Sequence, residues 1–350
     1  MSDFAAAQGV LRNAIRDGAF PAAVAEVGHH DVVLWQESFG HLTHKAGAFP
    51  TTLNTVFDLA SLTKVVATTT LAMRAIDRGR LELGEALINW LAEWRGADRK
   101  QVTIRHLLSH SSGLTAHLPF FSDCRGRAEF EPAICMMPLE YSPGSQSLYS
   151  DLGFILLGFV LEDAEGEGLD VQFAALAECY DWGELRFRPP MSWRTRTAAT
   201  EIDKWRGRLL VGEVHDGNAW ALGGVAGHSG LFGTTGAVGS FARTVLKGFR
   251  REVTFAQPDT FRIFTTPIDI VGSSRALGWD MMRRTSSCGT KMSRVSVGHT
   301  GFTGTSLWID PSVDLYIVLL TNRVYPTRNN DAILRVRPAF HDAVVEALTG

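Results

Sequence analysis

The amino-acid sequence predicts an α+β fold in which one antiparallel sheet is built from both ends of the chain. Strand-like segments lie near the N-terminus, at residues 22–27 and 32–39, and recur in the last third of the chain. The chain between them has mostly helical periodicity. Helices at the two termini should cover one face of the sheet, and the helical insert should lie beside it. Ligands commonly bind in the cleft between two such lobes.

Each element rests on its apolar spacing and on the residues that end it. Residues 3–16 have helical spacing before a glycine, and residues 331–348 form a C-terminal helix. Strand-like runs joined by short turns follow at 276–282, 295–298, 305–309 and 315–321. Further helices are predicted at 61–78, 87–94, 104–108, 152–164, 171–179 and 237–250. Residues 186–218 have no clear period and should form long loops, which are often functional.

These elements suggest two lobes within the 350 residues, which suffice for one large domain or two interlocked ones. A discontinuous sheet lobe takes residues 1–55 and 265–350. A mainly helical lobe, which carries the active-site loops, takes residues 56–264.

Composition and charge exclude several classes of protein. Hydrophobic residues make up 45% and charged residues 20% of the chain, as in a soluble globular protein. A net charge of −3 provides no basic surface for nucleic acid or anionic membrane. No secretory signal is evident and no apolar run is long enough to span a bilayer, so a cytoplasmic location is expected. The four cysteines form no C-x-x-C pair, which favours free thiols over a metal site.

The first chemical motif is Ser61-Leu62-Thr63-Lys64, where the helix predicted at 61–78 begins. Positions i and i+3 share a helical face, so the Ser61 hydroxyl and the Lys64 amine can touch. A serine hydroxyl is a poor nucleophile until a base takes its proton. A neighbouring ammonium lowers the pKa of the hydroxyl, and a buried lysine can itself become neutral and act as base. The motif is weak alone, but the apolar run at 56–60 indicates a buried helix start.

Two further motifs carry side chains suited to the same chemistry. Tyr149-Ser150-Asp151 precedes the helix at 152–164. The tyrosine pKa, ordinarily about 10, would be lowered by nearby cations toward use as a base, whereas Asp151 taken alone is best interpreted as a helix cap. His299-Thr300-Gly301 follows the strand at 295–298. Its glycine lets a substrate approach the strand, and His299 adds a group that titrates near neutral pH.

The order S-x-x-K, then Y-x-N-like, then K-T-G-like resembles the serine β-lactamase and penicillin-binding-protein superfamily. The separations, 88 residues from Ser61 to Tyr149 and 150 residues from Tyr149 to His299, suit its class C β-lactamase, family VIII esterase and D,D-peptidase branch. Similar stretches also occur at 107–114, 223–232 and 298–305. The resemblance covers nearly the whole chain and implies a β-lactamase/transpeptidase-like fold.

The resemblance implies that Ser61 forms an acyl-enzyme. Lys64 and Tyr149 would share proton transfer during acylation and deacylation, and which of them is the base stays open. The oxyanion hole would consist of the backbone N–H groups of Ser61 and Phe302. Thr300 and Gly301 would then help to bind the substrate.

Two positions depart from the family pattern. Asp151 stands in place of an asparagine, and its charge can hold Lys64 protonated, which favours Tyr149 as the base. His299 stands in place of the lysine that helps to receive a substrate carboxylate. A histidine that is mostly neutral at neutral pH does this less well. We therefore expect weak recognition of β-lactams and D-Ala-D-Ala peptides, and a preference for neutral esters or amides.

Other side chains are weaker candidates. His228 lies in a Gly-rich stretch and is expected to line the cleft, while His215 and Asp216 have either a structural role or a contact with substrate. His106 and His110 have the i, i+4 spacing of metal ligands, but no third ligand follows in a recognisable pattern, so ordinary helix and loop histidines are expected. An apolar acyl pocket and ordinary packing are equally good interpretations of Trp182, Trp193, Trp205 and Trp220.

The sequence thus predicts a serine hydrolase, with a carboxylesterase acting on small esters as the first hypothesis. A β-lactamase, a D,D-peptidase or D-aminopeptidase, and an acyltransferase are alternatives within the same fold. A receptor of the β-lactam-sensing kind, acylated once without turnover, is the non-enzymatic alternative. The expected partner is a small ester or amide, with no metal or organic cofactor. The oligomeric state is not predicted.

Overall fold

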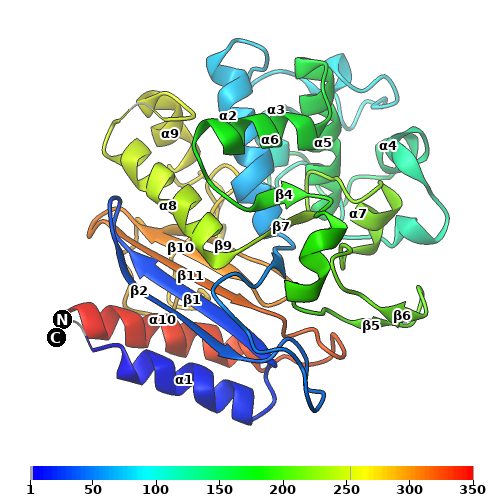
Figure 1. Cartoon of the computed structure of the whole chain (residues 1–350). Helices are drawn as coiled ribbons and strands as arrows, with labels where there is room; N and C mark the ends of the chain where they lie inside the picture. Colours follow the sequence, from blue (N-terminus) through cyan, green and yellow to red (C-terminus); the bar gives the residue numbers. More distant parts are fainter. Residues whose placement is uncertain (1–2, 253, 350) are drawn as a thin grey trace.

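A six-stranded antiparallel sheet forms the base of the molecule. The computed structural model describes residues 3–252 and 254–349 (Figure 1). The strand order is β2-β1-β11-β10-β9-β8, and every pairing is antiparallel. The strands come from both ends of the chain: β1 Ala22–Gly28, β2 Val33–Gly40, β8 Asp280–Met281, β9 Val297–Thr300, β10 Ser306–Asp310 and β11 Leu315–Thr321. The predicted α+β architecture is confirmed.

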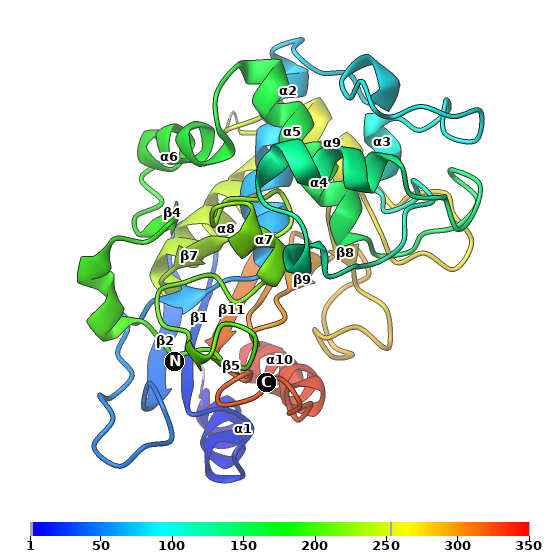
Figure 2. The ribbon, with the colours of Figure 1, turned by 90° about the vertical axis from the view of Figure 1, so that its right-hand side faces the viewer.

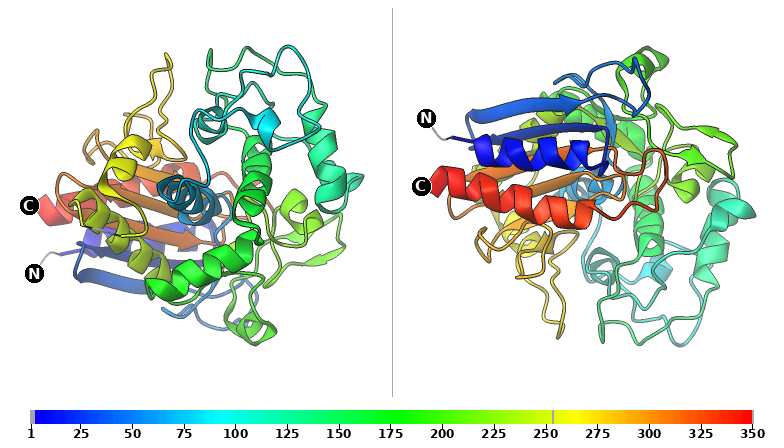
Figure 3. Two further views of the ribbon diagram at one scale, coloured as in Figure 1. Left: turned by 90° about the horizontal axis from the view of Figure 1, so that it is seen from above. Right: turned by 90° about the horizontal axis from the view of Figure 1, so that it is seen from below.

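The central strands of this sheet bury both faces, because successive side chains point in opposite directions. In β11, Val318 belongs to the core shared with the helical part, and the next residue, Leu319, belongs to the core beneath the sheet. The helices α1 Ala5–Arg16 and α10 Ile333–Thr349 cover the lower face. Figure 3 shows them side by side from below, as predicted for the terminal helices.

Helix α8 Thr235–Phe249 packs across the opposite face, on β1, β10 and β11. It approaches closely because Gly239 has no side chain: a Cβ there would collide with the carboxylate of Glu26. Glu26 is buried on β1 and accepts hydrogen bonds from Arg243 of α8 at 3.1 Å and from the Tyr316 hydroxyl of β11 at 2.7 Å. This buried polar cluster fixes α8 against the sheet.

The remaining helices gather on the α8 side of the sheet (Figures 1 and 2). They are α2 Thr70–Asp77, α3 Ile104–Leu108, α4 Gly126–Cys135, α5 Asp151–Glu165, α6 Leu169–Cys179, α7 Gly217–Ala221 and α9 Pro258–Phe264. A small sheet, β3 Phe57–Asp58, β7 Leu231–Gly233 and β4 Leu185–Phe187, and a hairpin, β5 Ile202–Asp203 with β6 Arg208–Leu209, complete the fold. Among the described residues, no helix is long and apolar enough to cross a membrane. The lobe boundaries at 55 and 265 stay a prediction.

Three predicted elements differ from the structure. The helix expected at 87–94 is only a 3₁₀ turn, Leu87–Asn89, in which the N–H groups of Asn89 and Trp90 bond to carbonyls three residues back. The strand expected at 276–282 is reduced to β8, because Gly278 has a φ of 82° that breaks the extended path. The helix expected at 61–78 begins with a π-helical segment, Lys64–Thr69, before α2.

The pH dependence of stability should report a buried histidine of α10. His341 is fully buried, and burial lowers its pKa from 6.5 to about 4. The unfolded chain therefore takes up a proton that the folded chain refuses, so the free energy of unfolding falls as the pH drops from about 6.5 to about 4. In His341→Gln this slope should be smaller by up to about 1.4 kcal/mol per pH unit.

Urea unfolding at several pH values between neutrality and pH 5 measures the slope. The exposed His41→Gln is the control, and its slope should match that of the wild type. An unchanged slope in His341→Gln would contradict the prediction.

Candidate active site

A cavity of about 680 Å³ brings the three sequence motifs together. It lies where the turn after β9 meets the segments that precede α2 and α5. Every predicted site residue except Lys64 lines it: Ser61, Tyr149, Asp151, His228, His299, Thr300, Gly301 and Phe302. Lys64 lies behind this wall and is fully buried.

Ser61 and Lys64 make the contact that their spacing predicts. Ser61 lies in the turn before the π-helical segment, and the Lys64 Nζ donates to its Oγ at 3.1 Å. Nζ also donates to Asp151 Oδ1 at 2.7 Å and to the main-chain oxygen of His228 at 3.0 Å. An ammonium group has three N–H donors, so these three acceptors satisfy it completely.

The Lys64 side chain is held as an ammonium. Burial acts to lower its pKa, but the Asp151 carboxylate and Tyr149 outweigh burial and raise the pKa above its ordinary value. For Asp151, burial acts to raise the pKa, and the Lys64 charge together with His117 lowers it further than burial raises it. His117 Nδ1 lies 3.5 Å from Asp151 Oδ2. An ion pair therefore occupies the place where the family pattern has a lysine and an asparagine.

Tyr149 keeps its proton although cations surround its ring. The ring centroid lies 4.8 Å from Lys64 Nζ and 5.1 Å from the guanidinium carbon of Arg275. Burial raises the pKa of the phenol, and Asp151 raises it as well. Interactions with Lys64 and Ser61 lower the pKa by less, so its net value is above the ordinary one. Our expectation that nearby cations would lower this pKa is wrong, because burial dominates.

Two buried histidines flank the phenol. The His110 ring lies 4.7 Å and the His299 ring 5.8 Å from Tyr149, measured between ring centroids. Burial, aided by nearby cationic side chains, lowers the pKa of both imidazoles well below 6.5. His299 is therefore a neutral imidazole, and its pKa does not lie near neutral pH as its residue type suggested. Its Nδ1 donates to the oxygen of Thr300 at 2.8 Å, which leaves the lone pair on Nε2.

His299 lies inside a strand and not after one, because β9 extends to Thr300. Nε2 of His299 is buried and has no hydrogen-bond partner among the residues that the structure describes. Thr300 and Gly301 follow at the cavity wall, where a Cβ on Gly301 would collide with Thr305. Glycine is thus required for the tight turn that leads to Phe302.

Two unpaired backbone donors lie at the predicted oxyanion hole. Within 3–252 and 254–349, neither the Ser61 N–H nor the Phe302 N–H has a hydrogen-bond acceptor. The segments that carry them are tied together by two hydroxyl groups. Thr303 and Thr305 donate to the main-chain oxygens of residues 58 and 59, at 2.7 and 3.0 Å. The relative position of the two donors is therefore fixed by the fold.

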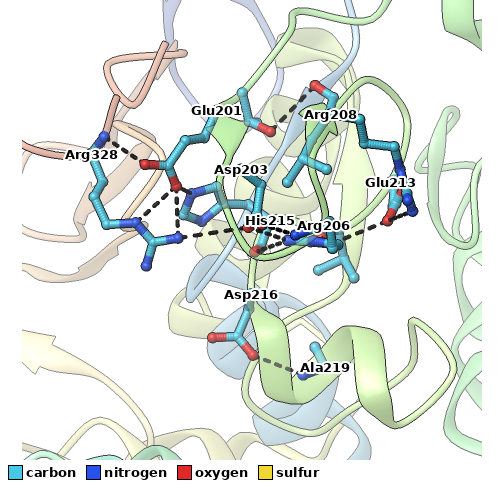
Figure 4. Close-up of polar contacts among 12 residues, drawn as sticks. Glu201, Asp203, Arg206, Arg208, Glu213, His215, Asp216, Ala219 and Arg328 are labelled. Carbon is cyan, nitrogen blue, oxygen red and sulfur yellow. Dashed lines mark hydrogen bonds and ion pairs between the residues drawn. The ribbon is translucent and has the colours of Figure 1, made fainter. Parts of the chain in front are cut away.

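Two of the weaker histidine candidates, His215 and His228, line the cavity, and each is paired with a carboxylate side chain. His228 Nε2 lies 2.7 Å from Asp216 Oδ1, and Asp216 also caps α7. His215 Nε2 lies 2.9 Å from Glu201 Oε2, and Figure 4 shows Glu201 between His215 and Arg328. Burial acts to raise the pKa of Glu201, but hydrogen bonds from His215 and Arg328 lower it to about 2. Asp216 and Arg328 line the cavity beside His215 and His228 and form its charged wall, while Glu201 pairs with His215 and Arg328 without lining it.

An acyl pocket made by the four tryptophans is the wrong interpretation. Trp205 lines the cavity, whereas Trp182 is fully buried in the core. Trp220 packs edge-on against Trp205, with centroids 5.2 Å apart. Packing beneath the loops accounts for most of the set.

Two residues beside the Tyr149 ring have places that the sequence did not predict: His110, which was weighed only as a metal ligand, and Arg275. His110 lies two residues after the end of α3, where its φ of 55° turns the chain, and its Nδ1 accepts a hydrogen bond from the Ser150 N–H at 3.0 Å. Its neighbour in spacing, His106, instead caps α3 with Thr103. The signal for His110 was its place in the stretch 107–114, whereas Arg275 carried no signal at all.

Removing the charge of Asp151 should destabilise the folded protein. Asp151→Asn leaves the buried Lys64 ammonium without its counter-charge, so the free energy of unfolding at neutral pH should fall by about 3–5 kcal/mol. Asp163→Asn, on the same helix, is the matched control: its pair with Arg127 is partly exposed and should contribute at most about 1 kcal/mol. Chemical denaturation of both variants measures the difference. Equal small losses would contradict this account.

Comparison with known proteins identifies the family of the chain. The family model described as Beta-lactamase matches residues 7–339. An N-acetylmuramyl-L-alanine amidase of Bacillus subtilis (strain 168) is 28% identical over 345 residues, which cover 87% of this chain and 77% of the relative.

Solved structures have the same fold. EstCE1, described as a hydrolase with promiscuous acyltransferase activity, matches with a TM-score of 0.77 and 22% identity over 96% of this chain and 97% of its own. A class C β-lactamase from Rhodobacter sphaeroides matches with a TM-score of 0.76 and 19% identity over 98% and 99%. The β-lactamase/transpeptidase-like fold is confirmed. Because the family model spans nearly the whole chain, the protein belongs to the Beta-lactamase family of serine hydrolases, as its resemblance to β-lactamases and penicillin-binding proteins predicts.

Proposed function

We propose that the protein cleaves small esters through an acyl-enzyme on Ser61. The observation that carries this proposal is the 3.1 Å contact between Ser61 Oγ and a fully buried ammonium, Lys64, at the wall of a cavity. The cavity volume of about 680 Å³ falls in the usual range for small-molecule sites. The unpaired N–H groups of Ser61 and Phe302 supply donors for the negative charge that develops on a carbonyl oxygen under attack.

In acylation, Ser61 Oγ attacks the ester carbonyl and loses its proton. Lys64 does not take that proton, because Asp151 keeps it as an ammonium. Tyr149 takes it instead. Since Tyr149 begins as a phenol, its own proton must move on, and the acceptor that we propose is the unpartnered lone pair at His299 Nε2, whose ring centroid lies 5.8 Å from that of Tyr149. Return of the proton along the same route releases the leaving group as an alcohol.

Deacylation repeats these transfers with water. Water attacks the acyl carbonyl, and its proton passes through Tyr149 to His299 Nε2. Collapse of the tetrahedral intermediate breaks the bond to Ser61 Oγ, which recovers a proton by the reverse route, and the acid product leaves. Lys64 contributes positive charge beside Ser61 throughout.

An amide is the second candidate substrate, because the relative from Bacillus subtilis that matches 87% of this chain is named as an amidase. The charged wall that contains Asp216 and Arg328 favours polar over purely apolar substrates. Comparison of matched esters and amides in one assay ranks the two. A stable adduct in intact mass, without turnover, would instead favour the receptor alternative.

Replacing the nucleophile should abolish hydrolysis. Ser61→Ala should lower kcat for a short-chain 4-nitrophenyl ester by at least about 10³-fold, because the proposed acyl intermediate forms on that hydroxyl. The exposed Ser122→Ala is the control and should retain wild-type activity. Undiminished hydrolysis by Ser61→Ala would refute the proposed nucleophile.

The pH profile should report a neutral His299. Its pKa lies well below 6.5, so kcat/KM for a neutral ester should stay constant as the pH falls from about 8 to about 6.5 and decline only at lower pH, where an imidazolium cannot accept a proton. His299→Gln should lower kcat by about 10²–10⁴-fold and remove this acidic decline. A variant with the wild-type rate and profile would show that the proton goes elsewhere.

A further inference from the structure

Arg337 is a buried arginine whose guanidinium contacts the turn that carries Phe302. It lies on α10, the helix that covers the lower face of the sheet (Figure 3), and only 5% of its surface is exposed. Its Nη2 donates to the main-chain oxygen of Gly301 at 2.7 Å and to that of Thr305 at 2.8 Å. Its Nε is buried and has no hydrogen-bond partner among the described residues. A full positive charge is thus directed at two neutral oxygens of one turn.

The charge of Arg337 is not balanced by a carboxylate. Within residues 3–252 and 254–349, no Asp or Glu oxygen lies within 4.0 Å of its guanidinium, whereas Arg328 has such a partner at 2.6 Å. Burial, together with the nearby charge of Arg323, lowers the pKa of the Arg337 guanidinium to about 9. His341, one turn further along α10, is neutral because burial lowers its pKa to about 4. An unpaired cation at such a place is costly for the folded protein.

The turn does not need Arg337 to satisfy its main-chain oxygens. The Gly301 oxygen also accepts a hydrogen bond from the Gly304 N–H at 3.0 Å, and the Thr305 oxygen accepts one from the Gly301 N–H at 2.8 Å. The backbone therefore closes this turn by itself. Hydrogen bonding within the turn does not explain why a costly cation is buried against it.

The Gly301 oxygen and the Phe302 N–H belong to the same peptide group. Because resonance couples the two ends of a peptide group, a donor on the oxygen draws electron density from the nitrogen and makes the N–H a stronger donor. A charged donor does so more strongly than a neutral one. The Phe302 N–H has no acceptor in the described part of the chain, and Phe302 lines the cavity. The charge of Arg337 thus acts on one of the two donors of the predicted oxyanion hole.

We propose that Arg337 is a positioning residue of the oxyanion hole, which polarises the peptide group between Gly301 and Phe302 and so strengthens the Phe302 N–H as a donor. The inference rests on the proposed function, because the negative charge forms when Ser61 attacks a carbonyl. A cation without a counter-charge in the resting protein gains one in the tetrahedral intermediate. The stabilisation is therefore greater in the transition state than in the bound substrate, and only such a difference accelerates the reaction.

Two esters that differ in one atom test the proposal. They are 4-nitrophenyl benzoate and O-4-nitrophenyl thionobenzoate, in which sulfur, a weak acceptor, replaces the carbonyl oxygen. Arg337→Met should lower the kcat/KM ratio of oxygen ester to sulfur ester by about 10- to 100-fold, which is less than the loss of a whole oxyanion donor. Arg337→Lys should retain part of the ratio, because an ammonium keeps the charge.

A control variant and a stability measurement separate this role from a structural one. Arg335→Met removes the same charge from an exposed position of α10 outside the cavity and should keep the wild-type ratio. In urea unfolding, Arg337→Met should have at least the wild-type free energy of unfolding, because it removes an uncompensated buried charge. Equal losses for the two esters in Arg337→Met, or no loss for either, would overturn the proposal.

A measurement on the peptide group distinguishes failure of this proposal from failure of the proposed function. Carbonyl-¹³C glycine combined with ¹⁵N phenylalanine selects the four Gly-Phe peptide groups of the chain, at 153–154, 158–159, 248–249 and 301–302. In Arg337→Met, the ¹³C and ¹⁵N resonances of the group at 301–302 should move to lower frequency, because its oxygen loses a charged donor. Undiminished hydrolysis by Ser61→Ala refutes the nucleophile but leaves this shift intact. Unchanged resonances refute the role of Arg337, whatever the turnover.

Discussion

The buried ammonium of Lys64 is the constraint on which the rest of the site depends. An unpaired charge in the interior costs several kcal/mol, and only complete hydrogen bonding offsets that cost. The three acceptors come from three separate segments: Ser61 beside it, Asp151 at the start of α5, and the carbonyl of His228 before β7. Satisfying one cation therefore brings together the start of two helices and a loop. The geometry at Ser61 follows from an electrostatic requirement of folding.

Burial, more than the sum of nearby charges, sets the protonation of the groups around that cation. Tyr149 keeps its proton although two cations face its ring, and both flanking histidines stay neutral. The proton transfer that we propose therefore uses a chain of groups and not a single strong base, because Lys64 and Tyr149 both begin protonated and Asp151 is paired with Lys64. This explains why neither Lys64 nor Tyr149 could be chosen as the base from the motifs alone.

Local sequence patterns predicted those helices and strands whose conformation is set by residues close together in the chain. Strand-like runs bounded by turn residues located β1, β2, β10 and β11, and helical spacing located α5, α6 and α8. Helical spacing did not reveal α4, which contains Pro132. The strand pattern was misleading at Gly278, where a positive φ interrupts the expected strand. The motif order located the residues around Ser61. Arg275 stayed invisible, because its position beside Tyr149 is created by tertiary contacts between segments 126 residues apart.

The pairing of the first strand with the last affects how the protein is made. Ala23 of β1 pairs with Thr321 of β11, so the first strand emerges from the ribosome long before its central partner exists. Contacts so distant in sequence make folding slow and keep apolar strand edges exposed meanwhile. The proposed active site has the same asymmetry: Ser61 is made early, but Phe302, the proposed second oxyanion donor, and Thr303, which ties its turn to Asp58, come near the end. An interrupted translation product would carry the proposed nucleophile without the proposed second oxyanion donor, so the proposed reaction requires the last strands of the sheet.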